Sequence, residues 1–192
     1  MNPLARVSAL VLAAFLIVGV AFLVLRNRPG EEPAPIVPTT LLEPASDASG
    51  QEISAALLAR ALEEIGAEAP LDAKLVLYIV FSTSDCGGCL SEAAVWDKLH
   101  QQFRAEGFQA VGIGHAQSKE DLDAFVRDEE LTFPVHWDRD ETVKGRLALD
   151  NTPYKILVDE SGSVVLTDPP NNSPRRQRDF EELVKGVAAL SL

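Results

Sequence analysis

The chain has 192 residues and a formal net charge of −12 at pH 7. This length fits one ordinary domain with extensions, and the negative charge excludes a nucleic-acid-binding protein, because contacts with phosphates need a basic face.

The first feature along the chain is a run without charged residues, from Val7 to Leu25. At about 1.5 Å per residue, a helix of this length nearly spans a bilayer core of roughly 30 Å. The alternative is a cleaved signal peptide, whose apolar region is shorter and ends at a small-x-small site. Because Gly19-Val20-Ala21 is followed by four more apolar residues, we predict an uncleaved transmembrane anchor over residues 1–26.

A proline-rich segment follows and is predicted to be a semi-rigid tether over residues 27–50. The prolines of this linker are Pro29, Pro33, Pro35, Pro38 and Pro44.

The charges that flank the predicted membrane span do not determine its orientation, because Arg6 precedes the span and Arg26 and Arg28 follow it.

Residues 51–192 alternate between helical and extended patterns, which predicts one α/β domain. Crossover helices between strands imply a mixed central sheet flanked by helices on both faces. A continuous apolar run at 75–81 suits a strand buried on both faces. In chain order we expect a helix at 53–65, a strand at 75–81, a helix at 86–107, a strand at 110–114, a helix after Ser118, a strand at 133–137, a short helix, strands at 154–158 and 163–166, and a final helix around 180–187.

The chain has two cysteines, which stand together as Cys86-Gly87-Gly88-Cys89 after the buried strand and at the start of a helix. Spacing of three residues on a helix brings both sulfurs within reach of one disulfide. The free N–H groups of the helix N-terminus stabilise a thiolate at Cys86. We therefore predict that Cys86 attacks a partner disulfide and that Cys89 resolves the mixed disulfide.

The cysteines have two alternative uses, in a zinc site or in a structural disulfide. A zinc site needs further ligands nearby, and His100, His115 and His136 are scattered, so no metal is expected. A structural disulfide that closes so short a loop would stabilise little. Redox chemistry without a cofactor is the preferred interpretation.

A second signal is Thr152-Pro153 at the start of a predicted strand. From the sequence alone, a trans proline at a strand start is common. A cis bond would instead turn the chain and present the Thr152 backbone beside the dithiol, where it binds substrate.

The order strand, Cys-x-x-Cys helix, strand and helix, followed by TFPVHWD and NTPYKILVDESGSVV, resembles the thioredoxin-like redoxins. It is most similar to their membrane-tethered TlpA/ResA type, which reduces disulfides outside the cytoplasm. The resemblance implies a thioredoxin-like fold, assigns Cys86 and Cys89 as nucleophile and resolving cysteine, and favours a cis bond at Thr152-Pro153. It also matches Glu92 to a glutamate common in the family, although a helix-start acid stabilised by the dipole is the preferred interpretation.

The chain departs from the family at several positions. Gly-Gly separates the cysteines, and Val80 stands where ordinary thioredoxins carry a buried aspartate. Asp85 replaces an aromatic residue before Cys86, where its charge should oppose thiolate formation or its side chain should cap the helix. Asp85 and Glu92 are thus candidates for proton transfer or for tuning the dithiol.

Two alternative functions remain open. The departures allow a non-catalytic docking subunit of a membrane complex. Thr83-x-x-Cys86 fits the peroxiredoxin pattern, which would make the chain a thiol peroxidase, but Ile79 stands where those proteins carry proline.

The predicted localisation follows from the dithiol, because disulfide-active pairs work where disulfides persist. We expect a single-pass protein of the bacterial inner membrane whose C-terminal domain faces the periplasm. Its expected partners are disulfide-bearing or dithiol proteins there.

A helix start carries three positive charges, which are unfavourable there, at Arg175, Arg176 and Arg178. The two interpretations of this segment are a solvated turn and a docking patch.

Overall fold

A computed structural model describes residues 53–191 except 69, 71, 85, 171 and 172. The predicted anchor (1–26) and linker (27–50) lie outside the described residues. Among the residues described, no helix is long and apolar enough to cross a membrane.

The centre of the domain is a five-stranded sheet in the order β3-β2-β1-β4-β5. β1 is parallel to β2, and β2 is parallel to β3, whereas β4 is antiparallel to both β1 and β5. The predicted mixed sheet is confirmed. The strands are β1 (Leu75–Ser82), β2 (Phe108–His115), β3 (Val135–Trp137), β4 (Tyr154–Asp159) and β5 (Val164–Asp168).

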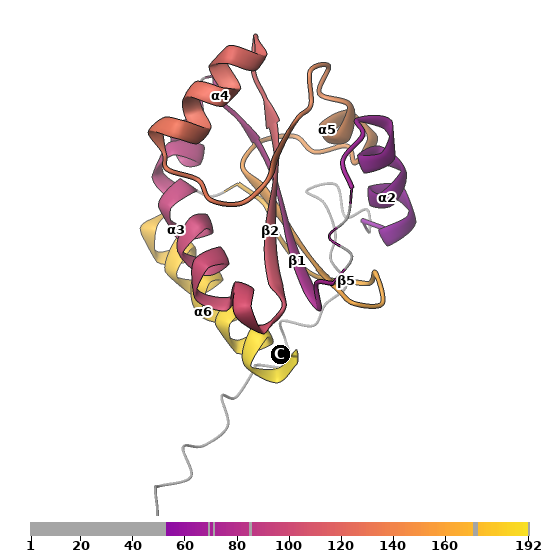
Figure 1. The fold of residues 1–192 in the computed structure, drawn as a ribbon, viewed down its shortest axis with the longest axis vertical. Coiled ribbons are helices and arrows are strands. Elements are labelled where there is room, and N and C mark those ends of the chain that lie inside the picture. Colours follow the sequence, from indigo (N-terminus) through magenta and orange to yellow (C-terminus); the bar gives the residue numbers. More distant parts are fainter. Residues whose placement is uncertain (1–52, 69, 71, 85, 171–172, 192) are drawn as a thin grey trace, which may run out of the picture. The chain divides into compact units, whose positions relative to one another are not determined.

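Helices cover both faces of this sheet, as Figure 1 shows: α3, α4 and α6 lie on one side, and α2 and α5 lie on the other. Every expected helix is present. The helix predicted to reach residue 107 ends earlier, at Phe103, and passes into a short 3-10 turn. The helices are α2 (Ala55–Glu64), α3 (Gly87–Phe103), α4 (Lys119–Asp128), α5 (Thr142–Arg146) and α6 (Pro174–Ser191), with the 3-10 helix η2 (Arg104–Glu106) after α3.

Local sequence signals explain where several elements begin and end. The Ser118 hydroxyl caps α4 by accepting from the Asp121 N–H at 3.1 Å, as the capping residues predict. The turn between β4 and β5 closes when the Asp159 carboxylate accepts from the N–H groups of Ser161 and Ser163, both at 2.9 Å. Gly162 follows with a φ of +81°, a conformation that favours glycine.

Alternation along the strands divides the core into two layers. One layer packs under α3, α4 and α6 and includes Cys89, Trp96 and Phe180. The other packs under α2 and α5 and includes Leu58 and Tyr78.

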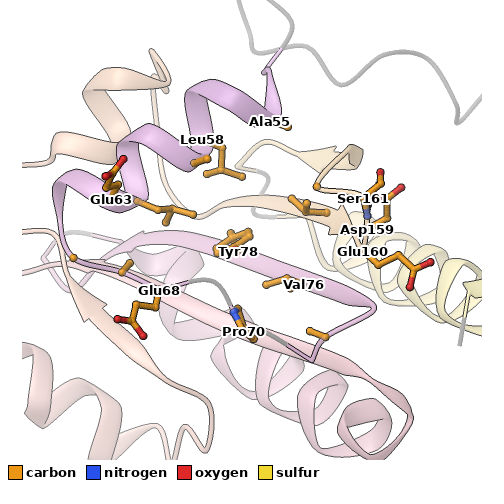
Figure 2. Close-up of a pocket in the computed structure, with 17 residues that line it drawn as sticks. Ala55, Leu58, Glu63, Glu68, Pro70, Val76, Tyr78, Asp159, Glu160 and Ser161 are labelled. Atoms are coloured by element: carbon orange, nitrogen blue, oxygen red, sulfur yellow. Dashed lines mark hydrogen bonds between the residues drawn. The ribbon is translucent and has the colours of Figure 1, made fainter.

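An open pocket of about 700 Å³ lies beside the layer under α2. The side chains of Leu58 and Tyr78 face it in Figure 2. The carboxylates of Glu63 and Glu160 lie at its margins. Burial raises the pKa of the Tyr78 phenol above its usual value.

Candidate active site

The dithiol is placed at the carboxyl end of the most buried strand. All residues of β1 before Ser82 are buried. The chain then leaves the sheet, and the Thr83 N–H bonds to the His115 carbonyl of β2 at 2.9 Å. This contact fixes the exit of the loop that carries Cys86.

Cys86 is the N-cap residue of α3, and it forms a disulfide with Cys89. The Cys89 N–H donates to the Cys86 sulfur at 3.2 Å. A donor at this position also stabilises a thiolate at Cys86 when the pair is reduced. Asp85, the proposed alternative cap or tuning residue, lies outside the described residues.

The two sulfurs differ in their access to solvent. Cys89 is fully buried, whereas Cys86 is partly exposed at the helix end. A partner disulfide can therefore reach Cys86 but not Cys89.

Thr152 lies against the exposed sulfur. The Thr152–Pro153 peptide bond is cis, as the family resemblance implies. The Thr152 carbonyl oxygen and its Oγ1 are each 3.6 Å from Cys86 Sγ. The predicted neighbours Cys86, Cys89, Thr152 and Pro153 thus come together at one end of the sheet.

Glu92 is the third group of the site, and it is buried rather than solvated at a helix start. Only 2% of its surface is exposed. Its Oε2 lies 2.5 Å from Lys155 Nζ and accepts from Trp96 Nε1 at 3.4 Å. Its Oε1 is buried and has no hydrogen-bond partner among the described residues.

The interpretation of Glu92 as a helix-start acid stabilised by the dipole is therefore wrong. Glu92 lies beyond the first turn of α3, which contains no acidic residue. Its partner is a buried cation instead, which is the usual requirement for a charge inside a protein.

Lys155 bridges two carboxylates in the core. Its side chain is 1% exposed, and its Nζ lies 2.5 Å from Glu92 and 2.7 Å from Asp168 Oδ2. Lys155 and Asp168 are directly opposite in the β4–β5 register, which brings their side chains together. The Phe180 ring lies 4.8 Å from the ammonium and adds a cation–π contact. We call Glu92, Lys155 and Asp168 the buried ionic triad.

Lys155 and Asp168 were not predicted as site residues from the sequence. The available signal was a lone lysine inside the apolar strand Tyr154–Asp159, because a charge in a buried strand needs a partner. Asp168 gave no comparable signal. Because the register of β4 and β5 shifts between Leu157 and Val158, counting residues from the turn does not predict which residue of β5 lies opposite Lys155.

A second buried polar group on this face lies farther along α3. His100 Nδ1 accepts from the Ala110 N–H of β2 at 3.3 Å. Burial lowers the pKa of His100, an effect that Asp97 opposes and Arg104 reinforces. No group of three or more His, Cys, Asp or Glu side chains in the described part of the chain is arranged to hold a metal ion.

The site can perform thiol–disulfide exchange with its own residues. It offers one accessible sulfur with a helix-end donor, a second sulfur within disulfide distance, and a backbone carbonyl beside them.

Comparison with known proteins agrees with this arrangement. The model of the AhpC/TSA family matches residues 52–167. The thiol-disulfide oxidoreductase ResA of Bacillus cereus is 23% identical over 89 residues, which are 46% of this chain and 51% of that protein. ResA of Geobacillus thermodenitrificans is 23% identical over 88 residues, with the same coverage. The chain thus spans about half the length of the curated relatives it matches.

Solved structures share the fold. The thioredoxin domain of a thiol-disulfide oxidoreductase from Bacteroides vulgatus has a TM-score of 0.53 at 18% identity, covering 77% of this chain and 91% of that one. A secreted Mycobacterium tuberculosis disulfide oxidoreductase, homologous to DsbE of E. coli, has a TM-score of 0.52 at 17% identity, covering 76% and 96%. The predicted thioredoxin-like fold is confirmed.

Proposed function

This chain belongs to the AhpC/TSA family, and from that premise we propose that it is a TlpA/ResA-type thiol–disulfide oxidoreductase that reduces disulfides of partner proteins through Cys86 and Cys89. The observation that carries this proposal is the unequal pair, in which Cys86 is accessible at the helix end and Cys89 is buried behind it.

The proposed reaction needs two exchanges. The Cys86 thiolate attacks one sulfur of the partner disulfide, so that a Cys86–partner bond forms and the other partner sulfur leaves as a thiolate. The Cys89 thiolate then attacks Cys86, which forms the Cys86–Cys89 disulfide and releases the second partner sulfur. Two electrons pass to the partner, and a dithiol protein must reduce the chain again.

Neighbouring residues have distinct proposed roles. The Thr152 backbone, with its carbonyl 3.6 Å from Cys86 Sγ, binds the partner's extended chain next to the reacting sulfur. Glu92, three residues after Cys89 on α3, accepts or supplies protons for the buried thiol or tunes it electrostatically. Asp85 opposes thiolate formation at Cys86.

The location is also a proposal. The uncharged run over 7–25 is long enough to anchor the chain in a bacterial inner membrane, and a dithiol of this kind works outside the cytoplasm. Protease added to spheroplasts should then remove the C-terminal domain. A domain that survives until the membrane is lysed would reverse this topology.

Turnover of disulfides tests the activity. The reduced protein should reduce a disulfide-linked peptide with a suitable dithiol as electron donor, and Cys86→Ser should abolish this turnover. A wild-type protein that reduces no disulfide would favour the non-catalytic docking subunit.

Thiol peroxidase activity is the second candidate function within this family, because Thr83 and Cys86 fit the peroxiredoxin pattern Thr-x-x-Cys. Peroxide consumption separates the two activities. Rapid consumption that survives Cys89→Ser, without disulfide reduction, would replace the oxidoreductase by the peroxidase.

A further inference from the structure

One large apolar side chain is exposed beside the dithiol. Leu90 directly follows Cys89 and is 56% exposed. A single exposed leucine is ordinary on a protein surface, so its position is what matters. It extends the surface around Cys86 along the first turn of α3, where the polypeptide attached to a reacting sulfur must lie.

The arginine cluster, which we define as Arg175, Arg176 and Arg178, is exposed at the start of α6. Gln177, within the cluster, donates from Nε2 to Ser91 Oγ at 3.1 Å, and Ser91 follows Leu90. The first turn of α6 therefore contacts α3 at Ser91, two residues after Cys89, and the arginines occupy exposed positions on either side of Gln177.

The cluster has little structural use among the described residues. Arg176 and Arg178 make no ion pair there, and Arg175 reaches Asp179 only at 3.9 Å, with both side chains exposed. Positive charges at a helix start also oppose the helix dipole. Three arginines and Asp179 give a local net charge of +2 on a chain whose net charge is −12.

The cluster makes the surroundings of the dithiol asymmetric. On the side of the cis-proline loop, the exposed charged residue is Asp150, two residues before Thr152. At the start of α6, the exposed charges are those of Arg175, Arg176, Arg178 and Asp179. A bound polypeptide therefore meets a positive surface beside α6 and a negative residue beside Thr152.

We propose that Leu90 and the arginine cluster form a docking surface for partner proteins that carry acidic residues beside the disulfide they present to Cys86. The inference rests on the proposed function and names its substrate class. Guanidinium groups bind carboxylates through paired hydrogen bonds, and an apolar centre with a charged rim is typical of protein interfaces. A membrane surface with anionic headgroups offers similar charge, but the contact of Gln177 with Ser91 beside the dithiol favours a partner polypeptide.

Two short disulfide-linked peptides that differ only in acidic or basic flanking residues test this surface. The full-length protein should reduce the acidic peptide with a kcat/KM about tenfold higher at low ionic strength, because opposite charges steer association. The preference should fade with added salt. The triple variant Arg175→Glu, Arg176→Glu, Arg178→Glu should reverse it, and it should fold, since acidic residues suit a helix start.

A matched variant controls for net charge. Arg60→Glu, Arg104→Glu and Arg127→Glu change the same amount of charge at exposed positions on α2, η2 and α4, and this variant should keep the preference. Leu90→Gln should lower kcat/KM for both peptides to the same extent. Turnover of an uncharged small disulfide normalises every variant for the chemistry of the dithiol.

Equal rates for the two peptides with the wild-type protein, or an equal shift in the control variant, would overturn the docking surface. Binding to phosphatidylglycerol vesicles that needs the cluster, without a peptide preference, would assign it to the membrane instead. If the small disulfide is not reduced at all, the proposed function fails. Fluorescence anisotropy with serine-substituted peptides still decides whether acidic segments bind.

Discussion

The two faces of the sheet are built from the same strands but differ in what they bury. Along β4, Tyr154 and Ile156 belong to the apolar layer under α2 and α5, whereas Lys155 lies between them on the opposite face. That face, under α3 and α6, holds the buried ionic triad at the dithiol end. The face under α2 borders the open pocket and holds the Tyr78 phenol.

The two faces therefore have different roles: the apolar face under α2 mainly stabilises the fold, and the face with the buried ionic triad mainly supports the dithiol site. Apolar burial under α2 contributes roughly in proportion to the area removed from water. A buried ion pair seldom stabilises more than apolar residues of the same size would, because both charges lose their hydration. The triad is therefore better explained by its place beside α3 than by stability.

The largest expected effect comes from removing the cation alone. Lys155→Met should lower the free energy of unfolding by about 3–5 kcal/mol, because Glu92 and Asp168 then remain buried without compensation. The triple variant Lys155→Met, Glu92→Gln, Asp168→Asn should recover most of this loss. Urea denaturation followed by tryptophan fluorescence measures both. A single variant as stable as the wild type would show that Lys155 does not compensate the two buried carboxylates.

On the opposite face, Leu58→Ala should cost about 2–4 kcal/mol through lost burial and a larger cavity. The reduction potential of Cys86–Cys89 should stay unchanged, because Leu58 lies across the sheet from the dithiol. A glutathione redox titration checks this. A shifted potential would mean that the two faces are not independent.

The smallest expected effect is a pH dependence on the α3 face. Because burial lowers the pKa of His100, the unfolded chain takes up the proton more readily than the folded one. The stability from this residue is complete above the unfolded value of about 6.5 and is lost as the pH falls below it. His100→Gln, which keeps a carbonyl acceptor, should lose less stability between neutral and mildly acidic pH. Identical pH profiles would contradict this.

The sequence predicts most of the fold because hydrophobic periodicity and capping residues are local signals. These local signals predicted the buried run of β1, the Ser118 cap and the turn after β4. The predicted ends of two strands were less accurate: β2 is longer than the predicted 110–114, and β3 is shorter than the predicted 133–137. Pairing with neighbouring strands sets these ends, and local sequence does not encode it.

The residues of the site also fall into two groups, those that local signals predict and those that depend on tertiary packing. Cys86, Cys89, Thr152 and Pro153 were identified from a motif and from the family resemblance. The pairing of Glu92 with Lys155 was not, because it joins α3 to β4 through tertiary packing that no local pattern encodes. Asp168 depends further on the β4–β5 register, which an irregularity shifts.

Trapping of the mixed disulfide tests most directly whether Cys86 attacks the partner and Cys89 resolves the intermediate. The reduced single variants Cys89→Ser and Cys86→Ser are each mixed with a disulfide-linked peptide, quenched with acid and analysed by mass spectrometry. We expect a peptide adduct on Cys86 in the Cys89→Ser protein and none in the Cys86→Ser protein. Equal adducts in both variants, or an adduct on Cys89 alone, would contradict this assignment.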